Sequence, residues 1–217
     1  IVAPLLLVVL LATGCLSIFK KDEIVATPGI PSLREIYQDY FEIGAAVSIA
    51  SWSDQTFYSH RHLIEKHFSS LTAENEMKPD GLQPRPNEFN FQVADRMVDF
   101  AYQNNIKVRG HTLLWHAQTP DWFFRDNDGR LIHEKVEITP GDKQLVRERL
   151  ENHIEKVMEH YAGKVYVWDV VNEAMSDNLS HTLREESPWY QILGDEFMEI
   201  AFKKAFEVDP NVKLFYN

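Results

Sequence analysis

The sequence predicts an α/β fold whose parallel strands belong to a β/α barrel. Strand-like and helix-like segments alternate four times before a fifth strand-like run, which is typical of right-handed β–α–β crossovers. Glycine-rich phosphate-binding motifs, the commonest sign of a doubly wound sheet, are absent from the sequence. Polar residues come at the C-terminal ends of at least three strands, and all strands of a barrel end on one face.

The first half of the chain contains two strands and two helices in alternation. Residues 41–50 form an apolar run in which Gly44-Ala45-Ala46 indicates tight packing inside a barrel. A short helix is expected over 61–68 and a second strand over 70–77. Apolar residues at roughly helical spacing then predict a helix over 91–103.

The second half repeats the alternation with a clearer pattern. After an apolar strand over 106–115, residues 142–161 place their apolar side chains on one stripe of a long helix. Thr139-Pro140 supplies that helix with a cap and a favourable first residue. The remaining elements are two strands over 165–171 and 212–217 and a helix over 196–208.

The length of the chain matches only part of a barrel. A complete (β/α)8 TIM barrel has eight strands and typically about 250 residues. The chain has 217 residues, and a leader takes up the first part of it. We therefore expect only about the first five strands of such a barrel, formed by residues 32–217.

Charge and composition exclude one class of partner. The chain is 44% hydrophobic, carries a net charge of −11 and shows no run of basic residues. Nucleic-acid binding therefore has no electrostatic basis in this sequence. An acidic balance is compatible with a soluble enzyme that acts on a neutral polymer.

The first 31 residues are typical of an exported protein. Residues 1–15 form a signal peptide whose apolar core is followed by small residues directly before Cys15. This end resembles a bacterial lipobox, which implies cleavage before Cys15 and lipid attachment to its sulfur. Residues 16–31 form a tether, and the lone cysteine excludes an internal disulfide.

We expect a cell-surface or outer-membrane lipoprotein that contacts the membrane only through this N-terminal anchor. Plain secretion, with the signal peptide cut before Ser32, is the alternative. The chain has neither an initiator methionine nor a basic segment before Ile1, so we expect it to begin inside its reading frame.

The segment 167–173 is an apolar strand that ends in an amide and a carboxylate. When a buried parallel strand ends in such side chains, it presents them on the active face of a barrel. Glu173 is therefore a candidate proton donor, and Asn172 is a candidate partner for a substrate hydroxyl.

Three long motifs carry a family resemblance. Residues 71–78 read LTAENEMK, residues 109–120 read RGHTLLWHAQTP, and residues 168–173 read WDVVNE. In this order they resemble glycoside hydrolase family 10, the endo-β-1,4-xylanases, and the resemblance covers residues 33–217. It implies hydrolysis of β-1,4 bonds in xylan and xylo-oligosaccharides with retention of configuration, without a metal or an organic cofactor.

The resemblance also implies roles for single residues. Glu173 occupies the position of the general acid/base. Seven residues fall on substrate-binding positions: Glu74, Asn75, Lys78, His111, Trp115, Gln118 and Asn172. The family's nucleophile is a glutamate after the seventh strand, so this chain alone is expected to be inactive, with exposed strand edges that favour aggregation.

The chemistry of a glycosidase asks for these residue types independently. A retaining mechanism needs a carboxylic acid to protonate the leaving oxygen and a carboxylate nucleophile about 5–5.5 Å away. Sugars present hydroxyls around an apolar ring, so amides, carboxylates and a lysine match the hydroxyls while Trp115 can stack on the ring.

Strand parity gives a partial test of the arrangement. Asp169 shares a face with Glu173, so we expect it inside the barrel below Glu173, as a charge or hydrogen-bond partner. Asn172 points the other way, and both residues reach substrate only if the strand end bends. His111 and Trp115 share parity and His116 does not, which argues against a metal site at the two histidines and favours His116 as a supporting hydrogen-bonding residue.

Two other functions stay open from the sequence. A β-1,4-glucanase on the same barrel would differ in the space around the sugar-binding residues. A surface glycan-binding lipoprotein would keep the cleft and lack the second catalytic carboxylate.

Overall fold

The computed structural model describes residues 29–48 and 55–217. The predicted signal peptide, the lipid site at Cys15 and most of the predicted tether lie outside the described residues. None of the helices in the described part is long and apolar enough to cross a membrane.

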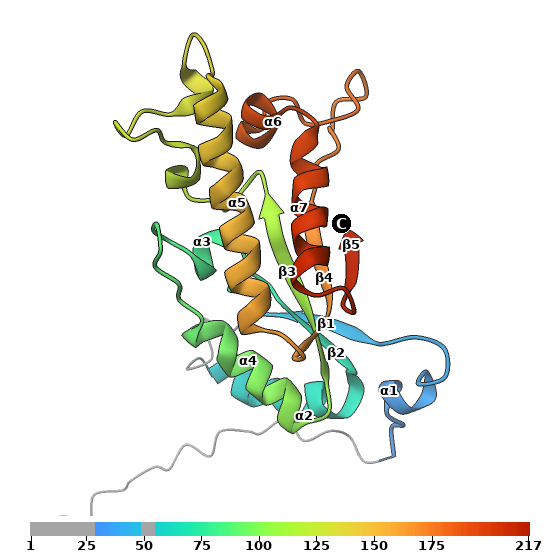
Figure 1. Cartoon of the computed structure of the whole chain (residues 1–217). Helices are drawn as coiled ribbons and strands as arrows, with labels where there is room; N and C mark the ends of the chain where they lie inside the picture. Colours follow the sequence, from blue (N-terminus) through green and yellow to red (C-terminus); the bar gives the residue numbers. More distant parts are fainter. Residues whose placement is uncertain (1–28, 49–54) are drawn as a thin grey trace, which may run out of the picture.

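The described strands form one parallel sheet of five strands in chain order (Figure 1). They are β1 (Gly44–Val47), β2 (Ser70–Ala73), β3 (Lys107–Trp115), β4 (Val165–Asn172) and β5 (Lys213–Tyr216). Each strand pairs with the next one along the chain, which is the connectivity of neighbouring barrel strands.

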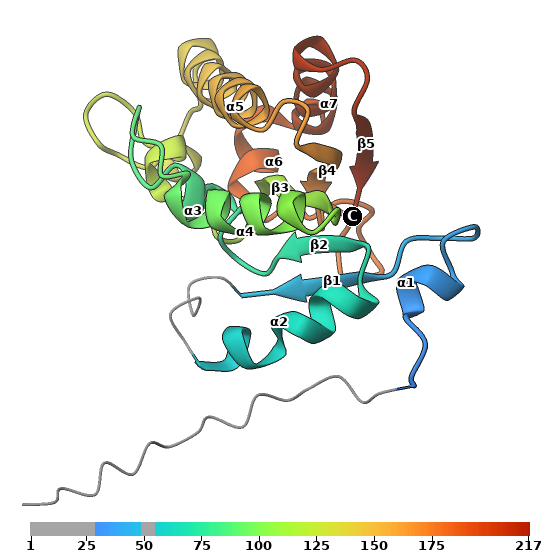
Figure 2. The same ribbon diagram turned by 90° about the horizontal axis from the view of Figure 1, so that it is seen from below.

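Helices cover the outer side of this sheet. Viewed from below, α2, α4, α5 and α7 follow the outside of the curved row of strands (Figure 2). The α-helices are α1 (Leu33–Ile36), α2 (Gln55–His67), α3 (Pro79–Leu82), α4 (Gln92–Gln103), α5 (Pro140–His160), α6 (Pro188–Leu193) and α7 (Glu196–Val208). Two 3₁₀ turns, η2 (Asp121–Phe124) and η3 (Ile132–Glu134), lie between β3 and α5.

The second strand is shorter than predicted. It ends at Ala73 rather than continuing to residue 77, and the chain turns so that the Lys78 N–H donates to the Asn75 carbonyl at 3.0 Å. Pro79 then begins α3, which the sequence analysis did not predict. Residues 74–78 are therefore a turn, and strand parity does not apply to them.

The long helix α5 forms as predicted and supplies much of the core. The Thr139 hydroxyl accepts from the Asp142 N–H, and the Asp142 carboxylate accepts from the Thr139 N–H, which closes a capping box. Four apolar side chains on one stripe of the helix are fully buried: Val146, Leu150, Ile154 and Val157. This face packs on the sheet and keeps the barrel wall in place.

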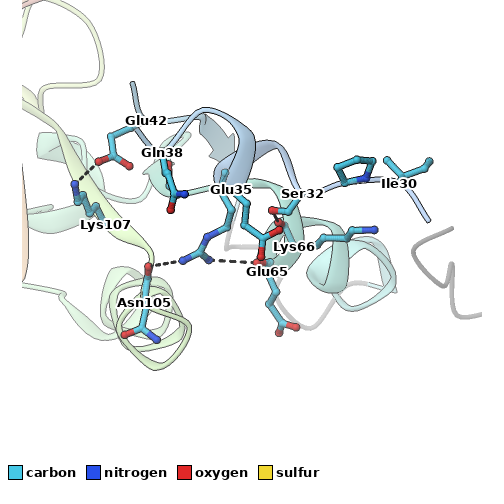
Figure 3. A pocket seen from close by; sticks show the side chains of 12 residues that line it. Ile30, Ser32, Glu35, Gln38, Glu42, Glu65, Lys66, Asn105 and Lys107 are labelled. Carbon is cyan, nitrogen blue, oxygen red and sulfur yellow. Dashed lines mark hydrogen bonds and ion pairs between the residues drawn. The ribbon is translucent and has the colours of Figure 1, made fainter. Parts of the chain in front are cut away.

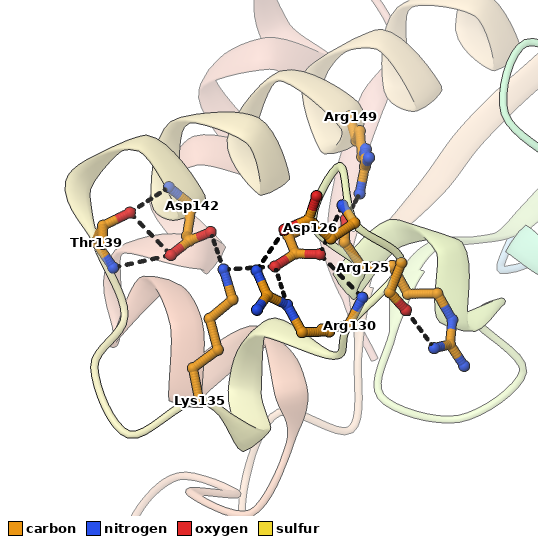
Figure 4. Close-up of polar contacts among 9 residues, drawn as sticks. Arg125, Asp126, Arg130, Lys135, Thr139, Asp142 and Arg149 are labelled. Atoms are coloured by element: carbon orange, nitrogen blue, oxygen red, sulfur yellow. Dashed lines mark hydrogen bonds and ion pairs between the residues drawn. The ribbon is translucent and has the colours of Figure 1, made fainter.

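A charged network anchors the connection between β3 and α5 (Figure 4). Lys135 Nζ lies 2.8 Å from Asp126 and 2.7 Å from Asp142, and these hydrogen bonds hold the pKa of both carboxyls below their usual values. Arg149 of α5 donates to the backbone carbonyls of Trp122, Phe123 and Arg125. The connection that follows β3 is thus fixed to α5.

Candidate active site

The candidate residues gather where β2, β3 and β4 end. These strands are parallel and each pairs with the next, so the residues that follow them lie along one edge of the sheet. The turn after β2 carries Asn75 and Lys78, the end of β3 carries Trp115, and the end of β4 carries Asn172 and Glu173.

Glu173 is exposed at this edge, and its carboxylate is held by a neighbouring strand. The indole Nε1 of Trp115 donates to Oε2 of Glu173 at 2.9 Å. Glu173 has a φ of 53°, in the left-handed region, so the chain bends sharply where β4 ends. This is the bend that Asn172 and Glu173 need in order to serve one site.

Asn172 is buried beside the end of β5. Its Oδ1 accepts from Nδ2 of Asn217 at 2.8 Å, and the carbonyl of Asn217 accepts from the Glu173 N–H at 2.8 Å. The last described residue of the chain therefore fixes both residues at the end of β4.

Lys78 joins the turn after β2 to the connection after β3. Its Nζ donates to Oδ1 of Asn75 at 3.0 Å and to Oε1 of Gln118 at 2.7 Å. The same ammonium lies 4.7 Å from the centre of the Trp115 ring, within the range of a cation–π contact. The side chain is 8% exposed, so a partly desolvated cation stands beside the indole that holds Glu173.

Asp169 is buried within the sheet and binds two side chains of β3. Arg109 donates to both of its carboxylate oxygens, and Nδ1 of His111 lies 2.9 Å from Oδ2. The hydroxyl of Thr112 donates to its carbonyl at 2.8 Å. The hydrogen-bonded partners of Asp169 are therefore Arg109 and His111, rather than Glu173 above it.

Two predicted residues make fewer contacts. The carboxylate of Glu74 is exposed and forms no side-chain hydrogen bond with the described residues. The ring of His116 meets Trp115 edge-on at 5.7 Å, and its buried Nδ1 has no hydrogen-bond partner among the described residues. Burial and the nearby charge of Arg184 lower the pKa of His116, which disfavours its charged form.

The opposite end of the sheet carries a separate polar hollow of about 680 Å³ (Figure 3). Arg34 donates there to the carbonyls of Glu65 and Asn105, and Lys107, the first residue of β3, pairs with Glu42. None of the candidate residues lines this hollow.

Comparison with known proteins identifies the family. Residues 32–217 match the model of glycosyl hydrolase family 10. The chain belongs to this family. The five-stranded parallel sheet is accordingly part of the family's (β/α)8 barrel, as the sequence predicted.

Several of the relatives are named xylanases, and one, from Acetivibrio thermocellus, is named exoglucanase XynX. A β-1,4-xylanase from Dictyoglomus thermophilum is 47% identical over 98% of this chain and 54% of its own length. Xylanase B from Clostridium stercorarium F9 is 42% identical with a TM-score of 0.80, over 87% of this chain and 55% of that one. A mutant structure in complex with xylotriose is 43% identical with a TM-score of 0.75, over 87% and 53%. The chain thus spans about half the length of these relatives.

Several residues around this family 10 site were missed from the sequence. Glu76 is buried and its carboxylate accepts from the Asn75 N–H at 3.1 Å. Arg109 lies two residues before His111, so strand parity could have revealed it. Trp189 donates to the Trp115 carbonyl at 2.9 Å from a position 74 residues away, and no local pattern predicts such a contact.

One parity argument was wrong. The pairing of β3 with β4 shifts register between His111 and Leu114, so the alternation of side chains is interrupted there. The even spacing between His111 and Trp115 therefore does not place their side chains on one face. Each is placed by its own contact, with Asp169 and with Glu173.

Proposed function

We propose that the protein containing this chain is an endo-β-1,4-xylanase that cleaves internal bonds of xylan and xylo-oligosaccharides with retention. The observation that carries this proposal is the exposed carboxylate of Glu173, held by the Trp115 indole at the carboxyl edge of the sheet. Amide, ammonium and imidazole groups that match sugar hydroxyls follow β2 or belong to β3, β4 and the connection after β3. The named xylanase relatives support the substrate class.

Glu173 acts as general acid and then as general base. Its carboxylic acid protonates the leaving sugar oxygen, and the resulting carboxylate takes a proton from the attacking water. Among the described residues only Oε2 is hydrogen-bonded, which leaves Oε1 for the proton transfer. The resemblance assigns the nucleophile to a glutamate after the seventh strand, and the five strands here carry the acid/base half of the pair.

Lys78 and His111 bind the sugar beside the cleaved bond. Lys78 has three N–H donors, of which Asn75 and Gln118 accept two, so one remains for a substrate hydroxyl. Asp169 holds Nδ1 of His111, which fixes the orientation of the ring and of its Nε2. Asn75, Gln118 and Asn172 supply further amide groups, and Glu74 supplies an exposed carboxylate.

The test is reducing-sugar release from xylan by the full-length protein and its Glu173→Gln variant. We expect the substitution to lower kcat/KM by about 10²–10⁴-fold, because it removes the proton donor while keeping the shape. Glu207→Gln, on the outer helix α7, is the matched control and should leave activity unchanged.

Three results would contradict the proposal. Binding of xylan without any release would indicate a glycan-binding protein. Faster cleavage of carboxymethyl cellulose than of xylan would indicate a glucanase. Full activity of Glu173→Gln would remove Glu173 from the acid/base role.

We further propose that the protein is exported and anchored through lipid on Cys15. The support is the apolar run over residues 4–11 followed by small residues directly before the cysteine. Labelled palmitate should enter the full-length protein in a bacterial host and be absent from Cys15→Ser. Label in both proteins, or in neither, would contradict the anchor.

A further inference from the structure

The loop that follows Glu173 closes back on itself beside the candidate acid/base. The backbone N–H of Arg184 donates to the Ala174 carbonyl at 2.8 Å, and a β-bridge joins Met175 to Leu183. The residue at the far end of this loop, Arg184, is therefore brought next to its first residues.

The guanidinium of Arg184 then turns toward Glu173. Its Nε donates to the Glu173 carbonyl at 3.3 Å, while Nη2 binds Asp177 at 2.7 Å and Nη1 lies 3.4 Å from Glu186. The side chain is only 14% exposed. The carboxylates of Asp177 and Glu186 thus orient the largely buried, planar guanidinium so that its Nε donates to the Glu173 carbonyl.

That carbonyl belongs to the residue with the left-handed backbone. The N–H of Glu173 is bound by the Asn217 carbonyl, and its C=O is bound by Arg184. A left-handed conformation is unfavourable for a glutamate, so it persists only where surrounding contacts hold it. Among the residues that the structure describes, Arg184 and Asn217 supply the hydrogen bonds to the peptide groups of Glu173.

The charge of Arg184 also acts on a residue that follows β3. Together with burial it lowers the pKa of His116, the residue after Trp115.

We propose that Arg184 is a positioning residue for the acid/base: by binding the carbonyl of Glu173 it fixes the left-handed bend and thereby the direction of the carboxylate. The inference rests on the proposed xylanase function. Arg184 acts through the backbone and does not touch the sugar, so its loss should impair proton donation more than sugar binding.

Leaving-group dependence separates these two effects. Phenyl β-xylobioside needs its leaving oxygen protonated, whereas dinitrophenyl β-xylobioside has a good leaving group and needs little help. In the full-length protein, we expect Arg184→Gln to lower kcat/KM on the phenyl substrate by about 10-fold or more and on the dinitrophenyl substrate by less than about 3-fold.

Two further variants protect the experiment against a folding defect. Asp177→Asn removes one of the carboxylates that aim the guanidinium, at a side chain that is 89% exposed, and should give a smaller loss with the same selectivity. Arg130→Gln breaks an arginine–carboxylate pair in the β3–α5 connection, at a side chain that is 67% exposed, and should leave kcat/KM on both substrates unchanged.

An equal fall on both substrates would show a merely structural role and overturn the inference, as would unchanged activity on both. If Arg184→Gln does not fold, the selectivity of Asp177→Asn decides. Failure of the proposed function is distinct, because the unmodified protein would then hydrolyse neither substrate.

Discussion

The indole of Trp115 links the end of β3 to the carboxylate of Glu173 at the end of β4, at 2.9 Å. Trp115 is itself held, since its carbonyl accepts from the indole of Trp189 at 2.9 Å. Trp189 of α6 therefore positions Trp115 through one hydrogen bond, and Trp115 positions the carboxylate of Glu173 through another.

Trp115→Phe removes the N–H donor and keeps most of the ring. Because a hydrogen bond to a charged group contributes about 1.5–3 kcal/mol, we expect kcat/KM on xylan to fall at least about 10-fold. Trp122→Phe is the matched control, since its indole donates to the Gln83 carbonyl, remote from Glu173. Equal losses in the two variants would contradict a special role for Trp115.

Lys78→Met should weaken substrate binding. It removes the ammonium that donates to Asn75 Oδ1 and Gln118 Oε1, so that among the described residues Asn75 Oδ1 keeps only the 3.3 Å bond from Nε2 of Gln118. We expect kcat/KM to fall about 10–100-fold, the range for a lost charged hydrogen bond. Steady-state kinetics of Lys143→Met, an exposed lysine on α5, give the comparison, and an unchanged Lys78→Met would refute the sugar contact.

Asp169→Asn should destabilise the fold. The substitution leaves Arg109 beside a neutral partner in a largely buried pair, and breaking such a pair costs about 3–5 kcal/mol. Urea unfolding of the full-length protein measures the loss. Asp128→Asn, in an exposed pair with Arg130, should cost less than about 1 kcal/mol, and similar losses in both would disprove the argument.

Gly110→Ala should be strongly unfavourable for packing. A Cβ at position 110 would lie 2.2 Å from the ring of Trp168, its partner on β4. Overpacking of this kind costs about 1–3 kcal/mol. Gly141→Ala meets its nearest atom at 3.7 Å and should leave the melting temperature unchanged or raised, so a neutral Gly110→Ala would be the contrary result.

His153 makes the fold sensitive to acid. Burial lowers the pKa of this histidine from 6.5 to about 3, so the unfolded chain binds a proton that the folded chain does not. The stability that its neutral form contributes is complete above pH 6.5 and is lost as the pH falls toward about 3. At pH 5 the loss is about 2 kcal/mol.

Unfolding free energies of the full-length protein at several pH values test this. His153→Gln should show a shallower decline between pH 6.5 and 4 than the unmodified protein, and exposed His181→Gln should not. Parallel curves for all three proteins would exclude His153 as the acid-sensitive group.

The sequence could predict the elements whose pattern is local. The stripe on α5 and the cap at Thr139 depend on neighbouring residues, and both were confirmed. The strand over 70–77 was extended too far, because the chain leaves the strand after Ala73 and turns at Asn75 before Pro79 begins α3. The strand propensity of single residues does not predict a turn that depends on one backbone hydrogen bond.

The site residues followed a similar division. Motif resemblance placed Lys78, Trp115 and Glu173 together, and the structure brings them together. The contacts that hold them come from Trp189 and Arg184, which depend on how distant segments meet. Such contacts are properties of the folded barrel and have no periodic signature.

The contact between Asn217 and Asn172 sets an order of events during synthesis. The two residues are 45 positions apart, so when β4 leaves the ribosome the partner of its last residue does not yet exist. The backbone N–H of Glu173 also donates to the carbonyl of Asn217. A nascent chain can therefore complete its outer helix α5 early, while the bend that directs the acid/base stays unlocked until β5 has been made.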